Sequence, residues 1–161
     1  MRTLLVGNTG YITNRFVEEA FPESLVMVMG DTSIRKNRKT NLFVRPFVKN
    51  EKELEDIFST YDFEQIIYFS NYLTFHGETR GEAEMLRKIL QLCRGKRNMR
   101  IVYLTGPERL YDVTTGKTLL VSEMENLCRE YAKLYKITVK IIRSPYLYSE
   151  QYEKDFLNTV F

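Results

Sequence analysis

The sequence predicts an α/β fold in which helices cover both faces of a parallel sheet. Short apolar runs rich in β-branched residues alternate with longer stretches of helical periodicity along the chain. The apolar runs are nearly continuous, which is typical of strands buried on both faces. Since strands that alternate with helices are joined by right-handed crossovers, we expect a doubly wound parallel sheet. The expected strands span residues 3–6, 25–29, 42–45, 65–69, 100–104 and 138–142.

Between these strands, the stretches 12–21, 51–60, 83–93 and 119–135 have the spacing of amphipathic helices. Each places its apolar residues on one stripe, which we expect to face the sheet. The expected stripes are Ile12, Phe16, Val17 and Ala20; Leu54, Ile57 and Phe58; Leu86, Ile89, Leu90 and Cys93; and Met124, Leu127, Cys128, Tyr131 and Leu134.

Composition places the chain among ordinary globular domains. Its 161 residues are 43% hydrophobic and 28% charged, enough to bury one core, and its net charge of +3 is mild for a nucleic-acid module. We expect Cys93 and Cys128 to be buried, reduced thiols, and His76 is the only histidine, so we expect no metal site. No signal peptide and no apolar segment of roughly 20 residues is visible. We therefore expect a cytoplasmic location, either as a free protein or as the cytoplasmic domain of a membrane-associated one.

An apolar run at the start of the chain leads into a turn that contains glycines. The run ends at Val6, glycines follow at Gly7 and Gly10, and the helical pattern begins at Ile12. This is the layout of a dinucleotide-binding strand–turn–helix, in which backbone N–H groups at a helix N-terminus receive a pyrophosphate. Thr13 stands where that pattern has its third glycine. We expect the turn to form, with less room for the pyrophosphate.

A basic cluster follows the second expected strand and consists of Arg35, Lys36, Arg38 and Lys39. One interpretation is a solvated loop, and another is an anion contact, because the ribose or 2′-phosphate of a nucleotide would lie here. We expect no nucleic-acid partner and no direct membrane contact; the alternative, nucleic-acid binding through this loop, predicts strongly salt-dependent association.

Several segments in register resemble the extended short-chain dehydrogenase/reductases, the group of nucleotide-sugar epimerases and dehydratases. These segments are residues 7–13, 29–33, 62–71, 99–111, 125–132 and 143–148. The first resembles the glycine motif of the family, and Asp31 stands where an acidic residue takes the adenosine ribose hydroxyls. The resemblance implies a Rossmann-type, doubly wound sheet of about six parallel strands in the order 3-2-1-4-5-6, with helices on both faces.

The catalytic pair of that family is missing from the matching position. In the family a tyrosine acts as acid/base, and a lysine four residues later lowers its pKa and holds the nicotinamide ribose. The matching helix start, residues 117–123, contains no Tyr-x-x-x-Lys in any register. The family's serine position falls near Pro107, and Thr105 just before it can donate one hydrogen bond. We therefore expect no catalytic residue, with tyrosines elsewhere in the chain as the alternative acid/base.

The resemblance assigns cofactor contacts to the glycine turn and to the ends of the second and fourth strands. The assigned residues are Gly7, Thr9, Gly10, Tyr11, Ile12, Asp31, Arg35 and Ser70. Three departures weaken this site: Thr13, the stretch Arg-Pro-Phe at 45–47 in place of an acidic contact to the adenine, and Ser70-Asn71 in place of small alanines. We expect the site to be vestigial and to bind no cofactor, with residual NAD or NADP affinity as the alternative.

The resemblance also has implications for the domain organisation of the chain and for its association with other copies. Family members continue into a substrate-binding lobe, and residues 155–161 have the apolar spacing of a starting helix. We therefore expect residues 1–161 to be a single domain of a longer protein. Family members pair through two helices, which correspond here to the helix from Glu82 to Arg94 and the helix from Leu119 to Tyr135. We expect a homodimer through them, or contact with a protein partner.

These observations lead to one main functional interpretation and two alternatives. The main one is a catalytically inactive domain, not an enzyme, that serves as a regulatory or protein-interaction module, in the neighbourhood of bacterial polysaccharide synthesis. The alternatives are a sensor that binds NAD or NADP, and an NAD(P)-dependent nucleotide-sugar epimerase, dehydratase or reductase with atypical residues. The link to polysaccharides is an analogy from fold.

Overall fold

The computed structural model describes residues 1–7, 11–19, 24–30, 41–45, 50–69, 79–105 and 116–143. Each expected strand is present, with both ends within one residue of the predicted bounds, and each expected helix is present as well. The elements are β1 (Arg2–Gly7), α1 (Tyr11–Glu19), β2 (Leu25–Gly30), β3 (Asn41–Arg45), α2 (Glu51–Tyr61), β4 (Gln65–Phe69), α3 (Thr79–Leu92), β5 (Arg100–Thr105), α4 (Gly116–Tyr135) and β6 (Thr138–Arg143). None of the described helices is long and apolar enough to cross a membrane.

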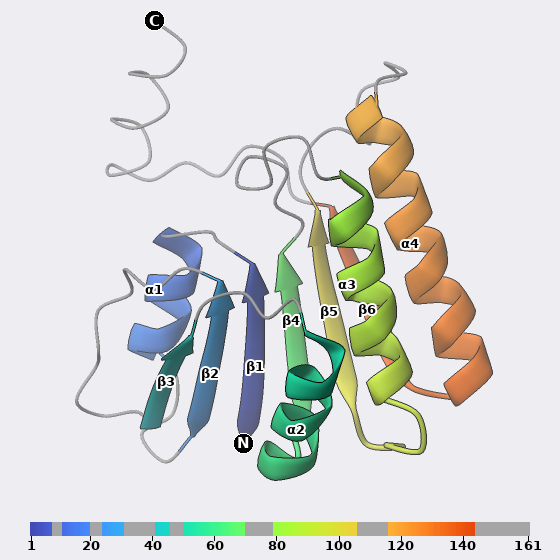
Figure 1. The fold of residues 1–161 in the computed structure, drawn as a ribbon. Coiled ribbons are helices and arrows are strands. Elements are labelled where there is room, and N and C mark those ends of the chain that lie inside the picture. The colour runs from blue at the N-terminus through green and yellow to red at the C-terminus, as the bar shows by residue number, and fades with distance from the viewer. Residues whose placement is uncertain are drawn as a thin grey trace, which may run out of the picture.

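The strands form one parallel sheet in the order β3-β2-β1-β4-β5-β6. All arrows in Figure 1 therefore point the same way. The order confirms the predicted 3-2-1-4-5-6 arrangement. It also places β1, the first strand of the chain, in the middle of the sheet between β2 and β4.

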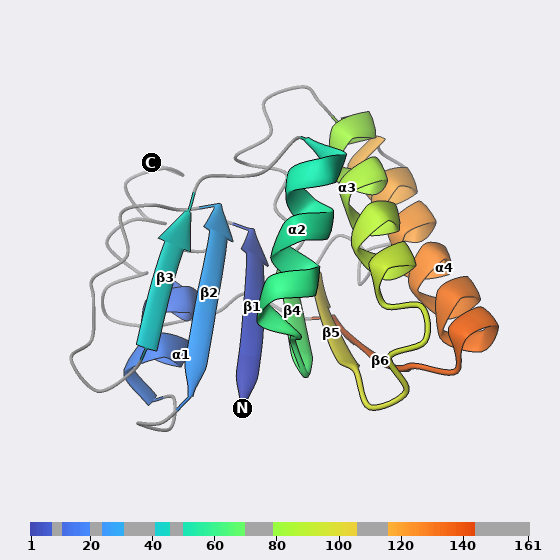
Figure 2. The same cartoon turned by 60° about the horizontal axis from the view of Figure 1, so that its bottom comes forward.

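Helices cover both faces of the sheet, as the sequence predicts. Figures 1 and 2 show α2, α3 and α4 on one face and α1 on the other. Right-handed crossovers explain this arrangement. From β1 the chain proceeds to β2 and β3 on one side, and from β4 it proceeds to β5 and β6 on the other side, so the helices of the two halves lie on opposite faces. The fold is a Rossmann-type doubly wound sheet.

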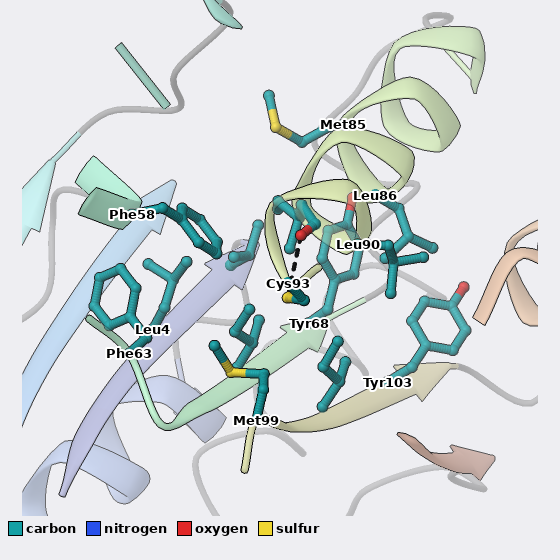
Figure 3. Packing of buried hydrophobic residues seen from close by; sticks show 14 of the residues in the cluster. Leu4, Phe58, Phe63, Tyr68, Met85, Leu86, Leu90, Cys93, Met99 and Tyr103 are labelled. Carbon is teal, nitrogen blue, oxygen red and sulfur yellow. Dashed lines mark hydrogen bonds between the residues drawn. The ribbon is translucent and has the colours of Figure 1, made fainter. Parts of the chain in front are cut away.

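Two buried clusters fill the space between the sheet and its helices. The larger lies under α2, α3 and α4; Figure 3 shows Leu4, Tyr68 and Tyr103 of the strands facing Phe58 and Leu90 of the helices. The smaller cluster lies on the face of α1 and contains Leu5, Val17, Val26, Val28, Ile67 and Phe69. Since successive strand residues point to opposite faces, a sheet covered on both sides needs apolar residues at every position. This is why the central strands appear as continuous apolar runs.

The prediction for α4 is wrong at one position. Met124, Leu127 and Cys128 are buried as expected, but Leu134 is 68% exposed. Gln91 Nε2, near the last residue of α3, donates to the hydroxyl of Tyr131 at 3.2 Å, so α3 ends level with that tyrosine. Leu134 lies almost one turn further along α4, where no residue of α3 remains to cover it.

The edge strand β6 also departs from the prediction of burial on both faces. Its residues alternate between exposed and half-buried, and Ile142 is 43% exposed. Because β6 has a neighbour on one side only, and α1 covers the opposite end of the sheet, its second face lacks a helix among the described residues.

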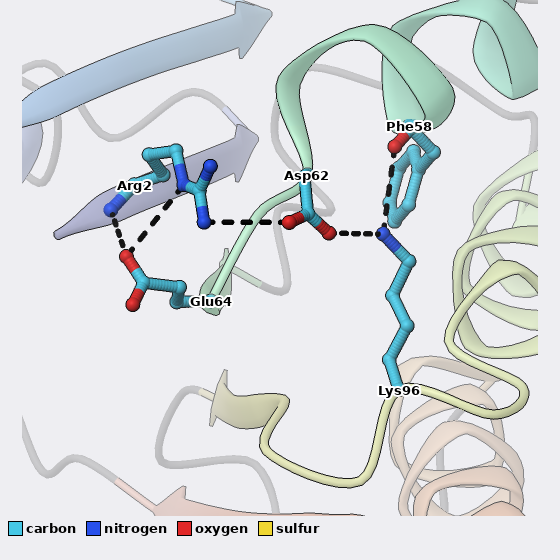
Figure 4. A network of polar contacts seen from close by, with 5 residues as sticks. All are labelled: Arg2, Phe58, Asp62, Glu64 and Lys96. Atoms are coloured by element: carbon cyan, nitrogen blue, oxygen red, sulfur yellow. Dashed lines mark hydrogen bonds and ion pairs between the residues drawn. The ribbon is translucent and has the colours of Figure 1, made fainter.

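Ion pairs join the elements at the amino edge of the sheet (Figure 4). Arg2 of β1 contacts Asp62 at 3.3 Å and Glu64 at 3.7 Å, and Lys96 contacts the other oxygen of Asp62 at 3.2 Å. Lys96 Nζ also reaches the carbonyl oxygen of Phe58 in the last turn of α2. A cation near a helix C-terminus is favourable, and exposed pairs of this kind contribute little individually. This network stabilises the edge opposite to the candidate site.

Candidate cofactor-binding edge of the sheet

The carboxyl ends of all strands lie at one edge, because the sheet is parallel throughout. In doubly wound sheets, ligands bind outside this edge where the helices that follow neighbouring strands leave to opposite faces. Here that place lies between β1, which is followed by α1, and β4, which is followed by α3. The described residues at the edge are Gly7, Gly30, Arg45, Phe69, Thr105 and Arg143, the last residue of each strand.

Glycine at the ends of β1 and β2 is required by close packing of three strand ends. Gly7 has a φ of +117°, and a Cβ on it would lie 2.8 Å from the carbonyl oxygen of Phe69 on β4. Gly30 has a φ of +140°, and its Cβ would lie 2.5 Å from the carbonyl oxygen of Gly7. Real Cβ atoms do not approach so closely, and side chains rarely adopt these φ values. The last residue of β1 therefore packs directly against the backbones of its two neighbouring strands, β2 and β4.

The helix that follows this turn presents its N-terminus at the same edge. Three residues separate Gly7 from Tyr11, where α1 begins, and the first turn of α1 contains no acidic residue. Unpaired N–H groups and the positive end of the helix dipole favour an anion at such a terminus. A strand end followed after three residues by a helix N-terminus is the arrangement that binds the pyrophosphate of a dinucleotide.

Of the predicted contact residues, the structure describes the backbone of three: Gly7, the last residue of β1, and Tyr11 and Ile12, the first two residues of α1. The side chains of Tyr11 and Ile12 are not described. Five predicted residues lie outside the described part of the chain: Thr9, Gly10, Asp31, Arg35 and Ser70. The rest of the basic cluster, Pro107 and residues 46–47 also lie outside it. Their assignments stay predictions.

Thr105 at the end of β5 has a buried hydroxyl group. Its side chain is 3% exposed, and Oγ1 has no hydrogen-bond partner within the described residues. A buried hydroxyl without a partner costs about 1–3 kcal/mol, so such groups are candidates for ligand contacts. This agrees with the sequence-based expectation that Thr105 can donate one hydrogen bond at this edge.

Arg45 at the end of β3 forms an ion pair with Glu53 in the first turn of α2. Arg45 stands where the family resemblance predicts an acidic contact to the adenine. The pair with Glu53 neutralises part of the guanidinium charge there, while its Nε is buried without a partner among the described residues. The arginine therefore keeps one unpaired donor at the β3 end of this edge.

Neither cysteine has the environment of a catalytic nucleophile. Cys93 and Cys128 are free and buried, as predicted, and burial raises the pKa of each thiol to about 12. Cys93 Sγ donates to the carbonyl oxygen of Ile89 within α3 at 3.2 Å. A thiol with this pKa stays protonated at neutral pH, and the protonated form is a poor nucleophile. No set of three metal-ligating side chains occurs in the described ranges.

Sequence reasoning missed the packing role of Gly30 and Phe69 and the pairing of Glu125. The signal for Gly30 was a glycine that directly ends an apolar strand. The signal for Glu125 was an acidic residue between Met124 and Cys128 on the buried stripe of α4, where it is 0% exposed. A carboxylate at such a position requires a cation, and the cation is Arg143, whose pKa is raised chiefly by its hydrogen bonds to Glu125.

Comparison with known proteins gives matches in structure alone. No family model matches the sequence, and no curated protein matches it. UDP-glucuronic acid 4-epimerase from Bacillus cereus, in complex with NAD, has a TM-score of 0.70 at 12% identity; the match covers 92% of this chain and 57% of that one.

Two further solved structures give similar values. dTDP-glucose 4,6-dehydratase from Bacillus anthracis, in complex with NAD, has a TM-score of 0.65 at 16% identity, over 89% of this chain and 54% of that one. L-threonine dehydrogenase from Clostridium difficile has a TM-score of 0.63 at 12% identity, over 88% of this chain and 52% of that one.

The chain has the fold of about half of each of these proteins. The predicted resemblance to the extended short-chain dehydrogenase/reductases is confirmed in the architecture of the sheet and its helices. The chain spans about half the length of the solved chains that it matches.

The comparisons contradict the prediction that the chain is not an enzyme. The three solved structures described above are an epimerase, a dehydratase and a dehydrogenase, and two of them contain NAD. The prediction relied on the missing Tyr-x-x-x-Lys at the start of α4. It gave one motif more weight than the arrangement of the whole sheet, which is the arrangement found in NAD-dependent enzymes.

Proposed function

We propose that this chain is the NAD-binding part of an enzyme that acts on a nucleotide sugar, of the epimerase or dehydratase type. The observation that carries the proposal is the end of β1, where Gly7 packs between Gly30 and Phe69 three residues before α1 begins at Tyr11. The solved epimerase and dehydratase with this fold, both in complex with NAD, support it.

Different residues would hold the different chemical groups of the cofactor. The N–H groups at the start of α1 suit the pyrophosphate, and Asp31 after β2 suits the hydroxyl groups of the adenosine ribose. NADP is the alternative cofactor, because Arg35 and Arg45 supply positive charge on the adenosine side. When bound, the nicotinamide ring accepts or returns a hydride.

The handling of the substrate proton must differ from that in the family. The start of α4 lacks the tyrosine–lysine pair, so an atypical residue has to take its part. Thr105 is our candidate for orienting the substrate, because its hydroxyl group is buried at the end of β5 without a described partner. A threonine hydroxyl orients a substrate by hydrogen bonding and does not by itself act as the base.

Cofactor titration tests the proposal. We expect NADH or NADPH to bind with a Kd below the millimolar range, measured by nucleotide fluorescence and by calorimetry. Asp31→Ala removes hydrogen bonds to the ribose, so its Kd for NADH should rise about tenfold. The matched control Asp56→Ala removes an exposed carboxylate of α2 and should leave the Kd unchanged.

Binding that is millimolar or weaker for both cofactors contradicts the proposal, as does an equal loss of affinity in Asp31→Ala and Asp56→Ala. A hydride-transfer assay with nucleotide sugars, followed at the absorbance of the reduced cofactor, then identifies the substrate. Thr105→Val preserves shape and removes the hydroxyl group, so it should lower turnover with little change in NADH affinity.

We also propose that two copies of the chain pair through the helix from Glu82 to Arg94 and the helix from Leu119 to Tyr135, in the cytoplasm. The large exposed side chain of Leu134 on α4 supports this pairing. An exposed leucine beside the half-buried Tyr131 and Tyr135 gains about 1.5–3 kcal/mol when a second copy covers it.

A further inference from the structure

A buried carboxylate joins α4 to the end of β6 through two arginines. Glu125 is 0% exposed. Arg143 donates from Nε to Oε1 at 2.9 Å and from Nη2 to Oε2 at 2.7 Å, and Arg129 donates from Nη2 to Oε2 at 3.0 Å. Arg129 and Asn126 are also linked, through Nη1 and Oδ1 at 3.1 Å. Two guanidinium groups therefore converge on one oxygen atom of Glu125.

The charges of this cluster do not balance. A buried carboxylate needs one cation, and the two parallel hydrogen bonds from Arg143 already supply it in the most favourable geometry. Arg129 adds a second positive charge, and its other contact, Asn126, is neutral. The cluster therefore carries one excess positive charge, which an additional anion would neutralise.

The arginines also keep donors that face outward. The side chain of Arg143 is 37% exposed, and that of Arg129 is 48% exposed. Within the described ranges, Nη1 of Arg143 and Nε of Arg129 contact no acceptor. Lys133 is exposed and follows Arg129 by one helical turn, which adds positive charge on the same side of α4. Glu130 lies about 100° further around the helix from Arg129.

We propose that Arg143 and Arg129 form a binding site for a phosphate group, with Glu125 as the positioning residue that holds both. The planar guanidinium fork matches phosphate oxygens, and its orientation is already set by the buried carboxylate, so little side-chain entropy is lost on binding. The site lies at the end of β6, separated from β2 by three strands. It is therefore remote from the adenosine side of the cofactor-binding edge and suits a second phosphate-bearing ligand.

Calorimetry with inorganic pyrophosphate, at constant ionic strength and neutral pH, tests this site. We expect pyrophosphate to bind, and Arg129→Gln to weaken it about tenfold while Glu125 keeps its pair with Arg143. The matched control is Arg87→Gln, which removes one positive charge from α3, where Arg87 lies 4.0 Å from Glu123 of α4. It should change the affinity less than twofold.

Glu125→Gln tests the positioning role. The amide keeps the shape of the side chain but no longer holds two cations, so pyrophosphate affinity should fall even where circular dichroism shows a folded protein. If this variant does not fold, Arg129→Gln alone still decides the proposal. An absence of pyrophosphate binding overturns it, and so does an equal loss in Arg129→Gln and Arg87→Gln. Unchanged affinity in Arg129→Gln places the anion elsewhere and overturns it as well.

Uridine diphosphate and uridine identify the source of the phosphate. Tighter binding of uridine diphosphate than of pyrophosphate, with the same dependence on Arg129, supports a nucleotide ligand, and equal binding of the two supports a free anion. Uridine that binds as tightly as its diphosphate contradicts phosphate recognition. Pyrophosphate also suits the N-terminus of α1, so the dependence on Arg129, and not binding alone, separates this outcome from that of the NADH titration.

Discussion

Gly30 and Gly7 show how single residues set the shape of the candidate site. Their missing side chains let β1, β2 and β4 approach one another, and both have positive φ values that side chains rarely adopt. The geometry required at this point is a property of the backbone. No other residue type combines these φ values with contacts so short.

We expect Gly30→Ala to lower the free energy of unfolding by about 3 kcal/mol, because its Cβ would lie 2.5 Å from the backbone oxygen of Gly7. Urea denaturation measures the change. The matched control is Gly95→Ala, where φ is +79° but no atom lies within 4 Å of the added Cβ, and where we expect about 1 kcal/mol. Equal losses in the two variants would contradict the packing argument.

At the level of elements, α2 shows how local sequence defines a helix. Asn50 accepts a hydrogen bond from the N–H of Lys52 at 3.0 Å, and Glu51 and Glu53 in the first turn suit the positive end of the helix dipole. The helix ends at Asp62, whose φ of 42° lies in the left-handed region. Leu54, Ile57 and Phe58 bury the face between these ends.

Loss of the cap should be measurable. We expect Asn50→Ala to reduce the free energy of unfolding by about 1 kcal/mol, because the first N–H groups of α2 lose an acceptor. The control is Ser59→Ala in the last turn, which removes a hydrogen bond to the carbonyl oxygen of Asp56 and should change stability by less than about 0.5 kcal/mol. Thermal or urea denaturation that ranks Ser59→Ala as the more damaging change would refute the assignment of the cap.

At the level of the whole molecule, α3 and α4 form a layer with one side on the sheet and the other side open. Arg87 and Glu123 link the two helices on this outer side at 4.0 Å, and Gln91 binds Tyr131. Leu134 lies on α4 beyond the point where α3 ends, and it is the most exposed apolar side chain on α4 in the described residues. In a dimer with a two-fold axis, Leu134 of each copy would be covered by the other copy.

We therefore expect the chain to sediment as a dimer, and Leu134→Gln to raise the dimer dissociation constant about tenfold or more, since each copy loses apolar contact area. Analytical ultracentrifugation over a range of concentrations measures this. Glu130→Gln, on the exposed side of the same helix, is the control and should leave the constant unchanged. A monomeric wild-type chain at the highest attainable concentration would reject the dimer.

The candidate site was predictable in part. The turn at Gly7 and the start of α1 follow from the spacing of glycines and apolar residues. The packing of Gly30 and Phe69 against Gly7 was not predictable from that spacing. These residues lie on strands that are far from Gly7 in the sequence and adjacent to it only in the sheet. The weight given to the missing tyrosine–lysine pair led to the wrong prediction about enzymatic activity.

The resemblance to a known family predicted the order of the sheet, and the sequence by itself determined the strands and the helices. These follow from the periodicity of apolar residues, which depends on neighbours a few positions away and on burial of both faces. Only the tertiary structure decided which apolar residues stay exposed, as at Leu134, and which charged residues meet, as Glu125 meets Arg143. Exposure and ion pairing depend on where one helix or strand ends beside another. Such contacts join residues that are far apart in the sequence, and the local periodicity of apolar residues carries no information about them.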